Sequence, residues 1–448
     1  MRSKPSPPSP SLRPLALFAL LLGAACAGGP RRSEAAGFQP LFNGRNLEEW
    51  VVVNGAPDTW TVRDGTIVCS GKPAGWLRTE RMFQNFILEF EWRHLTAGGD
   101  AGVFVWADAL PVRGEPYPRA VEVQMTDGSE TENTTRHGDV FSIHGARLTP
   151  ARAHPAGWPR SLPCERRCKP SPEWNHYRVT CVDGSIRLDV NGVEVSSASE
   201  VAPCEGYLGL EAAGSEVHFR DLRVRELPSK APPGSDRVAE ADCGFRSLFD
   251  GLGLTGWKEN PGRARHWTAR DGVLDYDGKG DHLWSLEEFG DFEMIADWRW
   301  SGPVARRALP VVLPNGEYDL DEEGNRRTVE VDEAGDSGIY LRGSEKAQVN
   351  IGCSPVGSGE VYGYRTDLSA PPEIRAGVTP RVRADAPVGE WNRLHLTMRG
   401  DRLTVVLNGK TLIEDAWLPG VPSKGRIALQ HHGSPIQFAN LFVRELRR

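Results

Sequence analysis

The most constraining feature of this chain is a strand pattern that occurs twice, at residues 86–93 and 292–299. In both copies every second residue is apolar and most of the residues between are charged. This period of two is typical of a β-strand with one face in a core and the other in solvent. The charged side carries an acid and a base at the same offsets in both copies: Glu91, Arg93, Asp297 and Arg299. A solvated sheet face is the simpler interpretation, and the repetition leaves a polar binding face open.

Further motifs recur in the same order in the two halves of the chain. They are Leu-Phe-Asn/Asp-Gly, Trp-x-x-x-Asp-Gly, an Asp-Ala/Ser-Gly turn, Glu-Trp-Asn and an Asn-Gly hairpin, at 41–44, 60–65, 100–102, 173–175 and 191–192, and again at 248–251, 267–272, 336–338, 390–392 and 408–409. The period is too long for a solenoid and indicates a tandem domain duplication. We expect two domains, at 38–227 and 245–448, joined by a Pro-rich linker at 228–244.

Short alternating runs, separated by Gly, Pro and Asn-Gly turns, favour an all-β fold. The 49 Gly and 34 Pro fit this interpretation, and no convincing long helical pattern is present. Each domain is therefore predicted to be a two-sheet sandwich or jelly roll. A stretch at 301–333 has no counterpart in the first copy and is expected to be a surface loop.

The N-terminus is predicted to direct export. Basic residues Arg2 and Lys4 precede an apolar run at 15–22 that is too short to span a bilayer stably. We interpret residues 1–26 as a signal peptide. Two processing routes are open: lipidation of Cys26, which attaches the protein to a membrane, or ordinary cleavage near that residue. Either route predicts an exported protein of the periplasm or cell envelope.

Charge and cysteine content limit which partners and cofactors this protein can be expected to bind. The net charge of −7, with no long basic stripe, argues against nucleic acid. Export permits disulfides, and Cys164 with Cys168, or Cys181 with Cys204, can bridge. The first pair lacks the second cysteine pair of a zinc site, so zinc is disfavoured. No cofactor motif is evident, and a divalent cation remains open.

The two copies differ at positions where a binding face is expected. Glu122 and Gln124 share one parity of a strand in the first copy, and Gln348 and Asn350 take the matching places in the second. Another glutamate of the first copy, Glu211, is likewise matched by an amide, Gln430. Amides hydrogen-bond but do not titrate near neutral pH. General acid–base chemistry needs a group that gains and loses a proton, so the first copy is better equipped for it.

One segment in each copy is a candidate loop at the site. In the first copy, residues 137–145 bring together His137, Asp139 and His144. These side chains are candidates for substrate binding or proton transfer, with a metal site or incidental surface histidines as alternatives. The equivalent segment of the second copy, 357–367, is rich in Gly and Tyr and suits stacking on a sugar.

Taken in order, the repeated motifs resemble the 3-keto-disaccharide hydrolase family, also called the 3-keto-glucoside 1,2-lyase/3-keto-2-hydroxy-glucal hydratase family. The resemblance covers about 38–227 and 245–447. It implies two tandem concanavalin-like jelly rolls and an exported enzyme that acts on oxidised glycosides. A ketone at C3 of such a sugar acidifies the C2 proton. Removal of that proton, elimination at C1 and hydration then amount to net hydrolysis, which requires a base, an acid and a donor to the enolate oxygen.

We predict that Glu122 and Glu211 serve as base and acid, with Arg93 as enolate stabiliser and His144 as a loop contributor. The predicted substrate-binding residues come from both copies: Glu91, Gln124, His137, Asp139, Asp297, Arg299, Arg342, Gln348, Asn350, Tyr364, Arg365, Gln430 and His431. The rival hypothesis is a non-catalytic carbohydrate-binding or adhesion protein, since jelly rolls serve both purposes. A catalytic first copy with a binding second copy fits the amide replacements.

Overall fold

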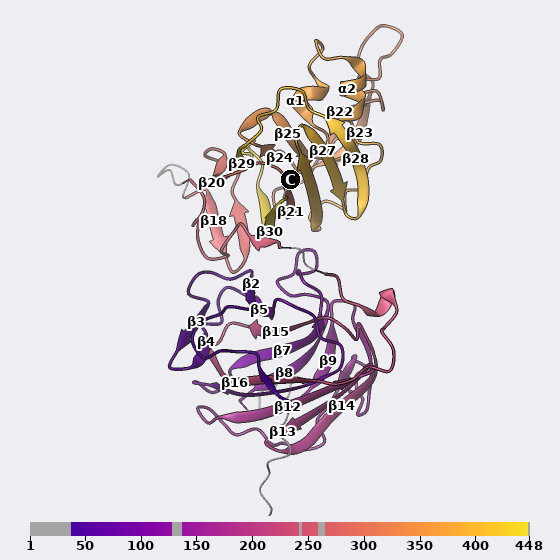
Figure 1. Ribbon diagram of the computed structural model, residues 1–448. Coiled ribbons are helices and arrows are strands. Elements are labelled where there is room, and N and C mark those ends of the chain that lie inside the picture. The colour runs from indigo at the N-terminus through magenta and orange to yellow at the C-terminus, as the bar shows by residue number, and fades with distance from the viewer. Residues whose placement is uncertain (1–36, 128–136, 242–243, 259–264, 447–448) are drawn as a thin grey trace, which may run out of the picture. The chain divides into compact units, whose positions relative to one another are not determined.

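In the computed structural model, the first copy is a sandwich of two antiparallel sheets (Figure 1). Its back sheet has the order β10-β14-β13-β12-β6-β16-β4-β3, with β1 paired to β16. These strands are β1 (Gln39–Pro40), β3 (Trp60–Arg63), β4 (Thr66–Cys69), β6 (Phe86–His94), β10 (Arg147–Pro150), β12 (Asn175–Val182), β13 (Ser185–Val190), β14 (Val193–Ala202) and β16 (Val217–Glu226). Its front sheet has the order β11-β9-β8-β7-β15-β5-β2. These strands are β2 (Trp50–Val53), β5 (Gly75–Thr79), β7 (Asp100–Ala107), β8 (Ala120–Thr126), β9 (Val140–Ile143), β11 (Arg160–Ser161) and β15 (Tyr207–Ala212).

The second copy repeats this arrangement. Its back sheet has the order β18-β19-β30-β21-β26-β27-β28, with β17 paired to β30. These strands are β17 (Arg246–Ser247), β18 (Trp267–Arg270), β19 (Val273–Tyr276), β21 (Phe292–Trp300), β26 (Asn392–Arg399), β27 (Arg402–Leu407), β28 (Lys410–Trp417) and β30 (Ile436–Glu445). Its front sheet, β20-β29-β24-β25, is smaller. These strands are β20 (Leu283–Phe289), β24 (Asp336–Leu341), β25 (Ser344–Gly352) and β29 (Gly425–Leu429). The predicted all-β fold of two tandem jelly rolls is confirmed.

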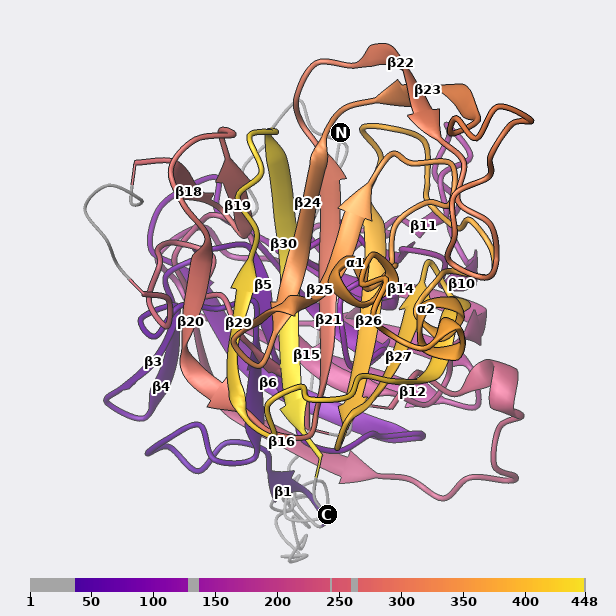
Figure 2. The same ribbon diagram turned by 90° about the horizontal axis from the view of Figure 1, so that it is seen from above.

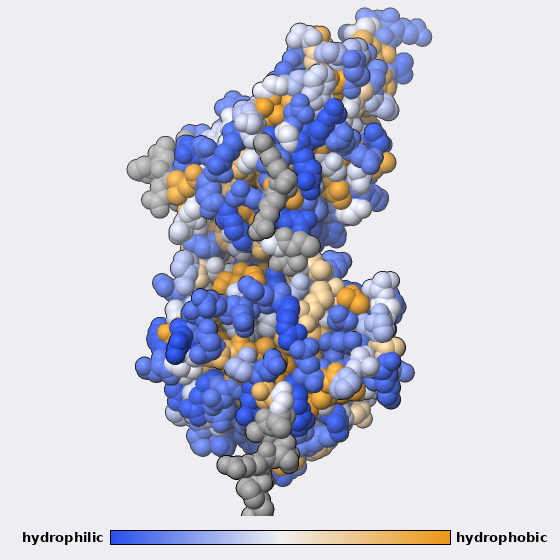
Figure 3. Space-filling model, in the orientation of Figure 1, coloured by the Kyte–Doolittle hydropathy of each residue, from blue (hydrophilic) through white to orange (hydrophobic). Residues whose placement is uncertain are grey.

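The structure describes residues 37–127, 137–241, 244–258 and 265–446. Those from Phe38 onward belong to one compact unit. The predicted signal peptide at 1–26, with Cys26, lies outside the described residues. Among the residues described, no helix is both long enough and apolar enough to cross a bilayer. The face drawn in Figure 3 is mostly hydrophilic, with its apolar residues in small groups.

The repeated strand behaves as its alternation predicts. On β6, the side chains of Phe86, Leu88, Phe90 and Trp92 are at most 3% exposed and pack in the core between the two sheets. The equivalent residues of β21 do the same in the second copy. The other parity of β6 is a ladder of cross-strand ion pairs, in which Glu89 binds Arg178 at 2.5 Å. Opposite charges on neighbouring strands stabilise a sheet face in this way.

Three connecting segments differ from simple loops. The insertion at 301–333 contains an exposed hairpin of β22 (Ala305–Pro310) and β23 (Thr328–Glu333). Two short helices, α1 (Tyr362–Arg365) and α2 (Pro372–Gly377), contact β25 and β28 respectively (Figure 2). The Pro-rich linker contains the one-turn helix η1 (Ser235–Arg237) and then follows the first copy, because the Ala239 amide donates to the Glu205 carbonyl at 2.8 Å.

The cysteines do not bridge as the spacing allowed. All six cysteines within the described residues are free thiols. Neither Cys164 and Cys168 nor Cys181 and Cys204 form a disulfide. Burial raises the pKa of the Cys168 thiol to about 12, as expected for an unreactive cysteine.

Candidate functional site

The two glutamates predicted as base and acid meet on the outer face of the first copy's front sheet. Glu122 lies on β8 and Glu211 on β15, the strands that flank β7. Their side chains reach toward each other over Gly102 of β7, where a Cβ atom would stand 2.5 Å from Glu122 Oε1. The two carboxyl groups are within hydrogen-bonding range of each other. A glycine between the two strands is therefore what leaves room for the pair.

Burial makes this carboxyl pair hold a proton. Glu122 is 5% exposed and Glu211 is 6% exposed. Burial, and then the charge of Glu211, raise the pKa of Glu122 well above its usual range. Burial, and then the charge of Asp100, raise the pKa of Glu211 to about 8. Two carboxylates in contact cannot both ionise easily, so the pair keeps at least one proton at neutral pH. Once Glu211 has ionised, the pair offers one hydrogen-bond donor and one base.

Three neighbours complete the surroundings of the pair. The hydroxyl of Tyr117 donates to the Ala212 carbonyl at 2.9 Å and lies within hydrogen-bonding range of Glu211. Burial raises the pKa of this tyrosine, so the hydroxyl keeps its proton. Gln124 donates to Asp100 at 2.5 Å on the same face. No sequence pattern pointed to Tyr117 or Asp100 as site residues, although Asp100 opens a motif that both copies share.

The predicted histidine segment lies beside this face. Backbone bonds join Gln124 to Asp139 and Gly138, which places the segment next to β8. Asp139 is fully buried and bound to Arg160 at 2.7 Å, and His137 is 3% exposed. His144 follows β9, whose last residue pairs with Ala120, and its side chain is exposed. The structure thus brings Glu122, Glu211 and Gln124 together, with the buried His137 and Asp139 adjacent.

Arg93 and Glu91 lie elsewhere, on the outer face of the back sheet. Arg93 stacks on Trp174 at 4.6 Å and approaches His218, while Glu91 binds Arg220 at 2.6 Å. The two sheets are separated by a core about 10 Å thick, which neither side chain crosses. The expectation that Arg93 stabilises an enolate beside Glu122 is therefore wrong.

In the second copy, an amide pair stands in the place of the carboxyl pair. Gln348 donates to Gln430 Oε1 at 2.6 Å, and Gln430 donates to the Tyr340 hydroxyl at 2.9 Å. The amides reach over Gly338, where a Cβ atom would stand 2.4 Å from Gln348 Nε2. Asn350 lies on the same strand, and its Oδ1 atom is buried with no hydrogen-bond partner among the described residues. This site keeps the geometry of the first copy but loses its titratable groups.

Aromatic side chains border the amide pair. Trp284 of β20 stacks on Tyr340, with ring centroids 5.8 Å apart, and His282 meets Tyr340 edge to face. Trp284 is half-buried. His431 bonds to the hydroxyl of Tyr276, beyond Gln430. At the other end of the face, Arg365 forms an ion pair with the buried Glu360, which lies 3.5 Å from Asn350.

Four other predicted residues of the second copy do not face this site. Arg342 is 1% exposed and binds carbonyl groups of the connecting loops, including that of Gly290 at 2.7 Å. Tyr364 is equally buried, and its hydroxyl donates to the Pro419 carbonyl at 3.0 Å. Both side chains therefore anchor loops. Asp297 and Arg299 lie on the back sheet, where Arg299 stacks on Trp391 at 4.6 Å. The prediction that these four residues line a substrate-binding face is therefore wrong.

Among the residues that the structure describes, no group of three or more His, Cys, Asp and Glu side chains is placed to hold a metal ion.

The family model of the 3-keto-alpha-glucoside-1,2-lyase-like domain matches residues 37–225 and 244–444. A 3-keto-disaccharide hydrolase of Bacteroides thetaiotaomicron is 24% identical over 249 residues, which are 43% of this chain and 80% of that protein. A solved chain from Parabacteroides distasonis, described as a candidate glycosyl hydrolase, is 22% identical, with a TM-score of 0.35 over 44% of this chain and 98% of its own length. A carbohydrate-binding module of Bacillus subtilis is 12% identical, with a TM-score of 0.30 over 40% and 96%. Because the family model covers nearly all of both copies, the chain belongs to the 3-keto-alpha-glucoside-1,2-lyase-like domain family.

Proposed function

We propose that this chain is an exported enzyme that cleaves 3-keto-glycosides, with its catalytic centre on the front sheet of the first copy. The observation that carries the proposal is the buried pair of Glu122 and Glu211, in which burial raises the pKa of both carboxyl groups. A related protein bears the name 3-keto-disaccharide hydrolase. Export, and attachment through a lipidated Cys26, rest on the leader sequence at 1–26.

The pair supplies both proton transfers that elimination requires. The ionised carboxylate takes the proton from C2, and the C–H electrons form the C1–C2 double bond as the C1–O bond breaks. The protonated carboxyl gives its proton to the departing oxygen. The two groups have then exchanged protonation states, so the reverse sequence adds water: one removes a proton from water, which attacks C1, and the other returns a proton to C2. No external acid or base is consumed.

A donor to the C3 oxygen completes the proposed mechanism. Charge develops on that oxygen as the C2 proton leaves, and a fixed donor stabilises it. Since Arg93 lies on the other sheet, we assign this role to the outer face of the front sheet. Tyr117 carries a protonated hydroxyl there beside Glu211, and the role requires that this hydroxyl turn from the Ala212 carbonyl to the substrate oxygen when the sugar binds.

The direct test is incubation of the purified protein with a 3-keto-glucoside and with its unoxidised parent. Release of the aglycone from the keto sugar alone is expected, because only a C3 ketone acidifies the C2 proton. Equal release from both sugars would point to ordinary glycoside hydrolysis. No release from either, with a folded protein and added divalent cation, would favour the binding-protein hypothesis.

Turnover is expected to rise as the pH rises through about 8, the raised pKa of Glu211, because the ionised Glu211 is then the base. The hydrogen bond between the two carboxyls lowers the pKa of Glu211 and raises the pKa of Glu122, so Glu122 keeps its proton and serves as the acid. At still higher pH Glu122 ionises as well and no acid is left, which gives a bell-shaped profile. The measurement is kcat/KM against pH. A limb near pH 8 that the Glu211→Gln variant retained unchanged would contradict this assignment.

A second candidate function, carbohydrate binding without turnover, is favoured for the second copy. The Gln348–Gln430 pair has hydrogen-bonding groups but no proton to exchange, and the half-buried Trp284 offers a ring face beside it. Sugars present hydroxyl groups to amides and C–H faces to aromatic rings. The unpartnered Oδ1 atom of Asn350 is an acceptor suited to a sugar hydroxyl.

Trp284→Ala is expected to weaken sugar binding by the second copy roughly tenfold, the usual effect of truncating an aromatic anchor. Calorimetric titration with a 3-keto-glucoside and its parent, in a Glu122→Gln background that suppresses turnover, measures the loss. Trp417→Ala is the matched control, because Trp417 is an exposed tryptophan of the same copy on the back-sheet strand β28. Equal affinities for both variants would argue against a site on this face.

A further inference from the structure

The loop that joins β7 to β8, residues 108–119, leads directly into the carboxyl pair. Its base is closed by Asp108 and Arg119, which form two bonds at 2.9 and 2.8 Å. Higher up, the Val112 amide donates to the Tyr117 carbonyl at 3.0 Å. Tyr117 is therefore part of this loop, and it is also the residue whose hydroxyl lies beside Glu211. The position of the loop determines where that hydroxyl stands.

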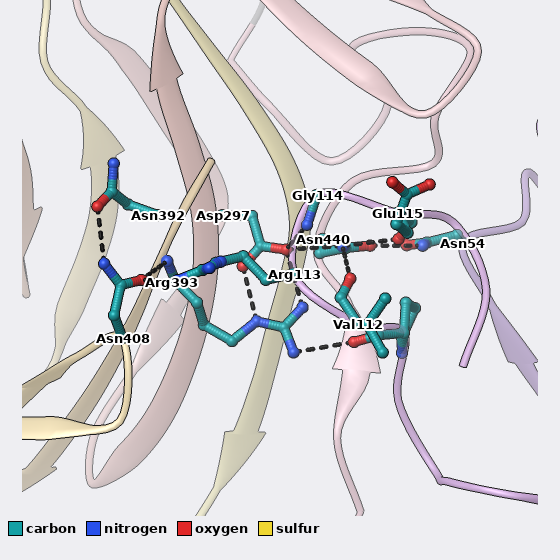
Figure 4. A network of polar contacts seen from close by, with 11 residues as sticks. Asn54, Val112, Arg113, Gly114, Glu115, Asp297, Asn392, Arg393, Asn408 and Asn440 are labelled. Atoms are coloured by element: carbon teal, nitrogen blue, oxygen red, sulfur yellow. Dashed lines mark hydrogen bonds and ion pairs between the residues drawn. The ribbon is translucent and has the colours of Figure 1, made fainter. Parts of the chain in front are cut away.

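The second copy holds the tip of the loop through its back sheet (Figure 4). The amide of Gly114 donates to Asp297 Oδ2 at 2.8 Å, and Arg393 donates to the Pro111 carbonyl at 2.8 Å. Asn440 donates to the Glu115 carbonyl at 3.0 Å. These bonds bind loop backbone groups to side chains of β21, β26 and β30.

The anchoring side chains are themselves fixed. Asp297 is fully buried and receives two bonds from Arg393, at 2.7 and 2.8 Å, and one from Asn440 at 2.7 Å (Figure 4). The equivalent residue in the first copy, Glu91, has a side chain 28% exposed that binds its neighbour Arg220. The repeated acidic position is thus a surface ion pair in one copy and a buried anchor in the other.

Apolar contacts reinforce the same arrangement. Trp76 and Phe104, on the outer face of the first copy's front sheet, belong to one buried cluster with Ile295 and Phe442 of the second copy. Tyr117 packs against this cluster. The back sheet of the second copy therefore covers part of the face that carries the carboxyl pair, and it excludes water from that side.

We propose that the second copy is a positioning domain for the first: Asp297, Arg393 and Asn440 hold the β7–β8 loop and thereby fix Tyr117 at the catalytic pair. This inference rests on the proposed function of that pair. Asp297 and Asn440 are positioning residues, since they act on the site through the loop. The positioning role also explains why an enzyme with its titratable carboxyl pair in the first copy carries a second copy that lacks such a pair.

The test uses Asp297→Asn in the full chain. The amide keeps the size of the carboxylate but turns a donor toward Gly114 or Arg393, so the loop loosens. Turnover is expected to fall about 10- to 100-fold, as small misplacements of catalytic groups do. The limb of the pH profile near pH 8 moves to higher pH as well, because the hydrogen bond from Tyr117 that lowers the pKa of Glu211 is lost. Hydrogen–deuterium exchange of residues 108–119 rises, and this readout needs no turnover.

A matched pair of variants guards against misfolding of Asp297→Asn. Asn440→Gly removes the anchoring amide at a residue with φ of 48°, a backbone conformation that glycine adopts freely. Asp221→Gly makes the equivalent change in the first copy, at φ of 54° on an exposed side chain, and is expected to leave turnover and loop exchange unchanged.

The outcomes separate this inference from the proposed function. Wild-type turnover, pH profile and loop exchange in folded Asp297→Asn and Asn440→Gly would overturn the positioning role. If the wild-type protein does not cleave a 3-keto-glucoside, the proposed function fails. Hydrogen–deuterium exchange of the β7–β8 loop is then the measurement that tests the positioning role. Faster exchange in Asn440→Gly than in Asp221→Gly then supports the positioning of the loop, and equal exchange rejects it.

Discussion

Glu122→Gln is expected to lower turnover of a 3-keto-glucoside by about 10²- to 10⁴-fold, the range in which a general acid or base acts. The variant removes one of two groups that exchange a proton, so the pair no longer provides both an acid and a base. Glu211→Gln is expected to have a similar effect. The double variant should be little worse than either single one, because the two residues act as a unit.

The fold is expected to survive this change. The second copy already shows the amide version of the pair, in which Gln348 and Gln430 keep a 2.6 Å hydrogen bond over Gly338. Loss of turnover in Glu122→Gln is therefore expected to come from lost proton transfer and not from unfolding. A melting temperature equal to that of the wild-type protein would establish this.

Glu89→Gln is the control for Glu122→Gln. Glu89 is also a buried glutamate of the first copy, but it lies on the back sheet between Arg178 and Arg223. Its replacement breaks an ion-pair ladder and lowers stability, while turnover by the folded fraction stays at the wild-type level. Wild-type turnover in Glu122→Gln, with substrate saturation confirmed, would remove Glu122 from the mechanism.

Local patterns in the sequence predict much of the fold. The alternation of β6 and β21 determines which side chains enter the core, because a strand has only two faces. Asn-Gly turns, as at Asn191, take a backbone with φ of 50° that few residues tolerate, and they mark the hairpins. The difference between the copies at Glu122 and Glu211 also leads to the site, since both positions lie on the same face of neighbouring strands.

Strand alternation does not reveal which sheet a strand joins. Arg93 has the right parity for a binding face but the wrong sheet, and only the pairing of β6 with β12 and β16 separates it from Glu122. Contacts far apart in sequence are equally hidden. Asp297 repeats the position of Glu91, yet its partner is Gly114, in a loop of the other copy. Arg342 and Tyr364 bind loop carbonyls that no local pattern points to.

Gly102→Ala is expected to lower turnover about 100-fold while both glutamates remain in place. The added methyl group would stand 2.5 Å from Glu122 Oε1 and 2.8 Å from its Cδ, so the carboxyl must turn away from Glu211. A displacement of about 1 Å at a reacting group is enough for a loss of this size. Separation weakens the charge and hydrogen-bond effects of Glu211 that raise the pKa of Glu122. The alkaline limb of the pH profile, where Glu122 loses its proton, therefore moves to lower pH, which a general loss of stability does not produce.

Gly338→Ala is the matched variant, because it places the same methyl group 2.4 Å from Gln348 Nε2 under the amide pair of the second copy. If chemistry belongs to the first copy alone, Gly338→Ala weakens sugar binding and leaves cleavage of a small 3-keto-glucoside intact. Kinetics on both variants therefore assign the reaction to one sheet. Equal losses of turnover in the two would mean that both copies take part in cleavage, and the amide pair would then need a catalytic role that involves no proton of its own.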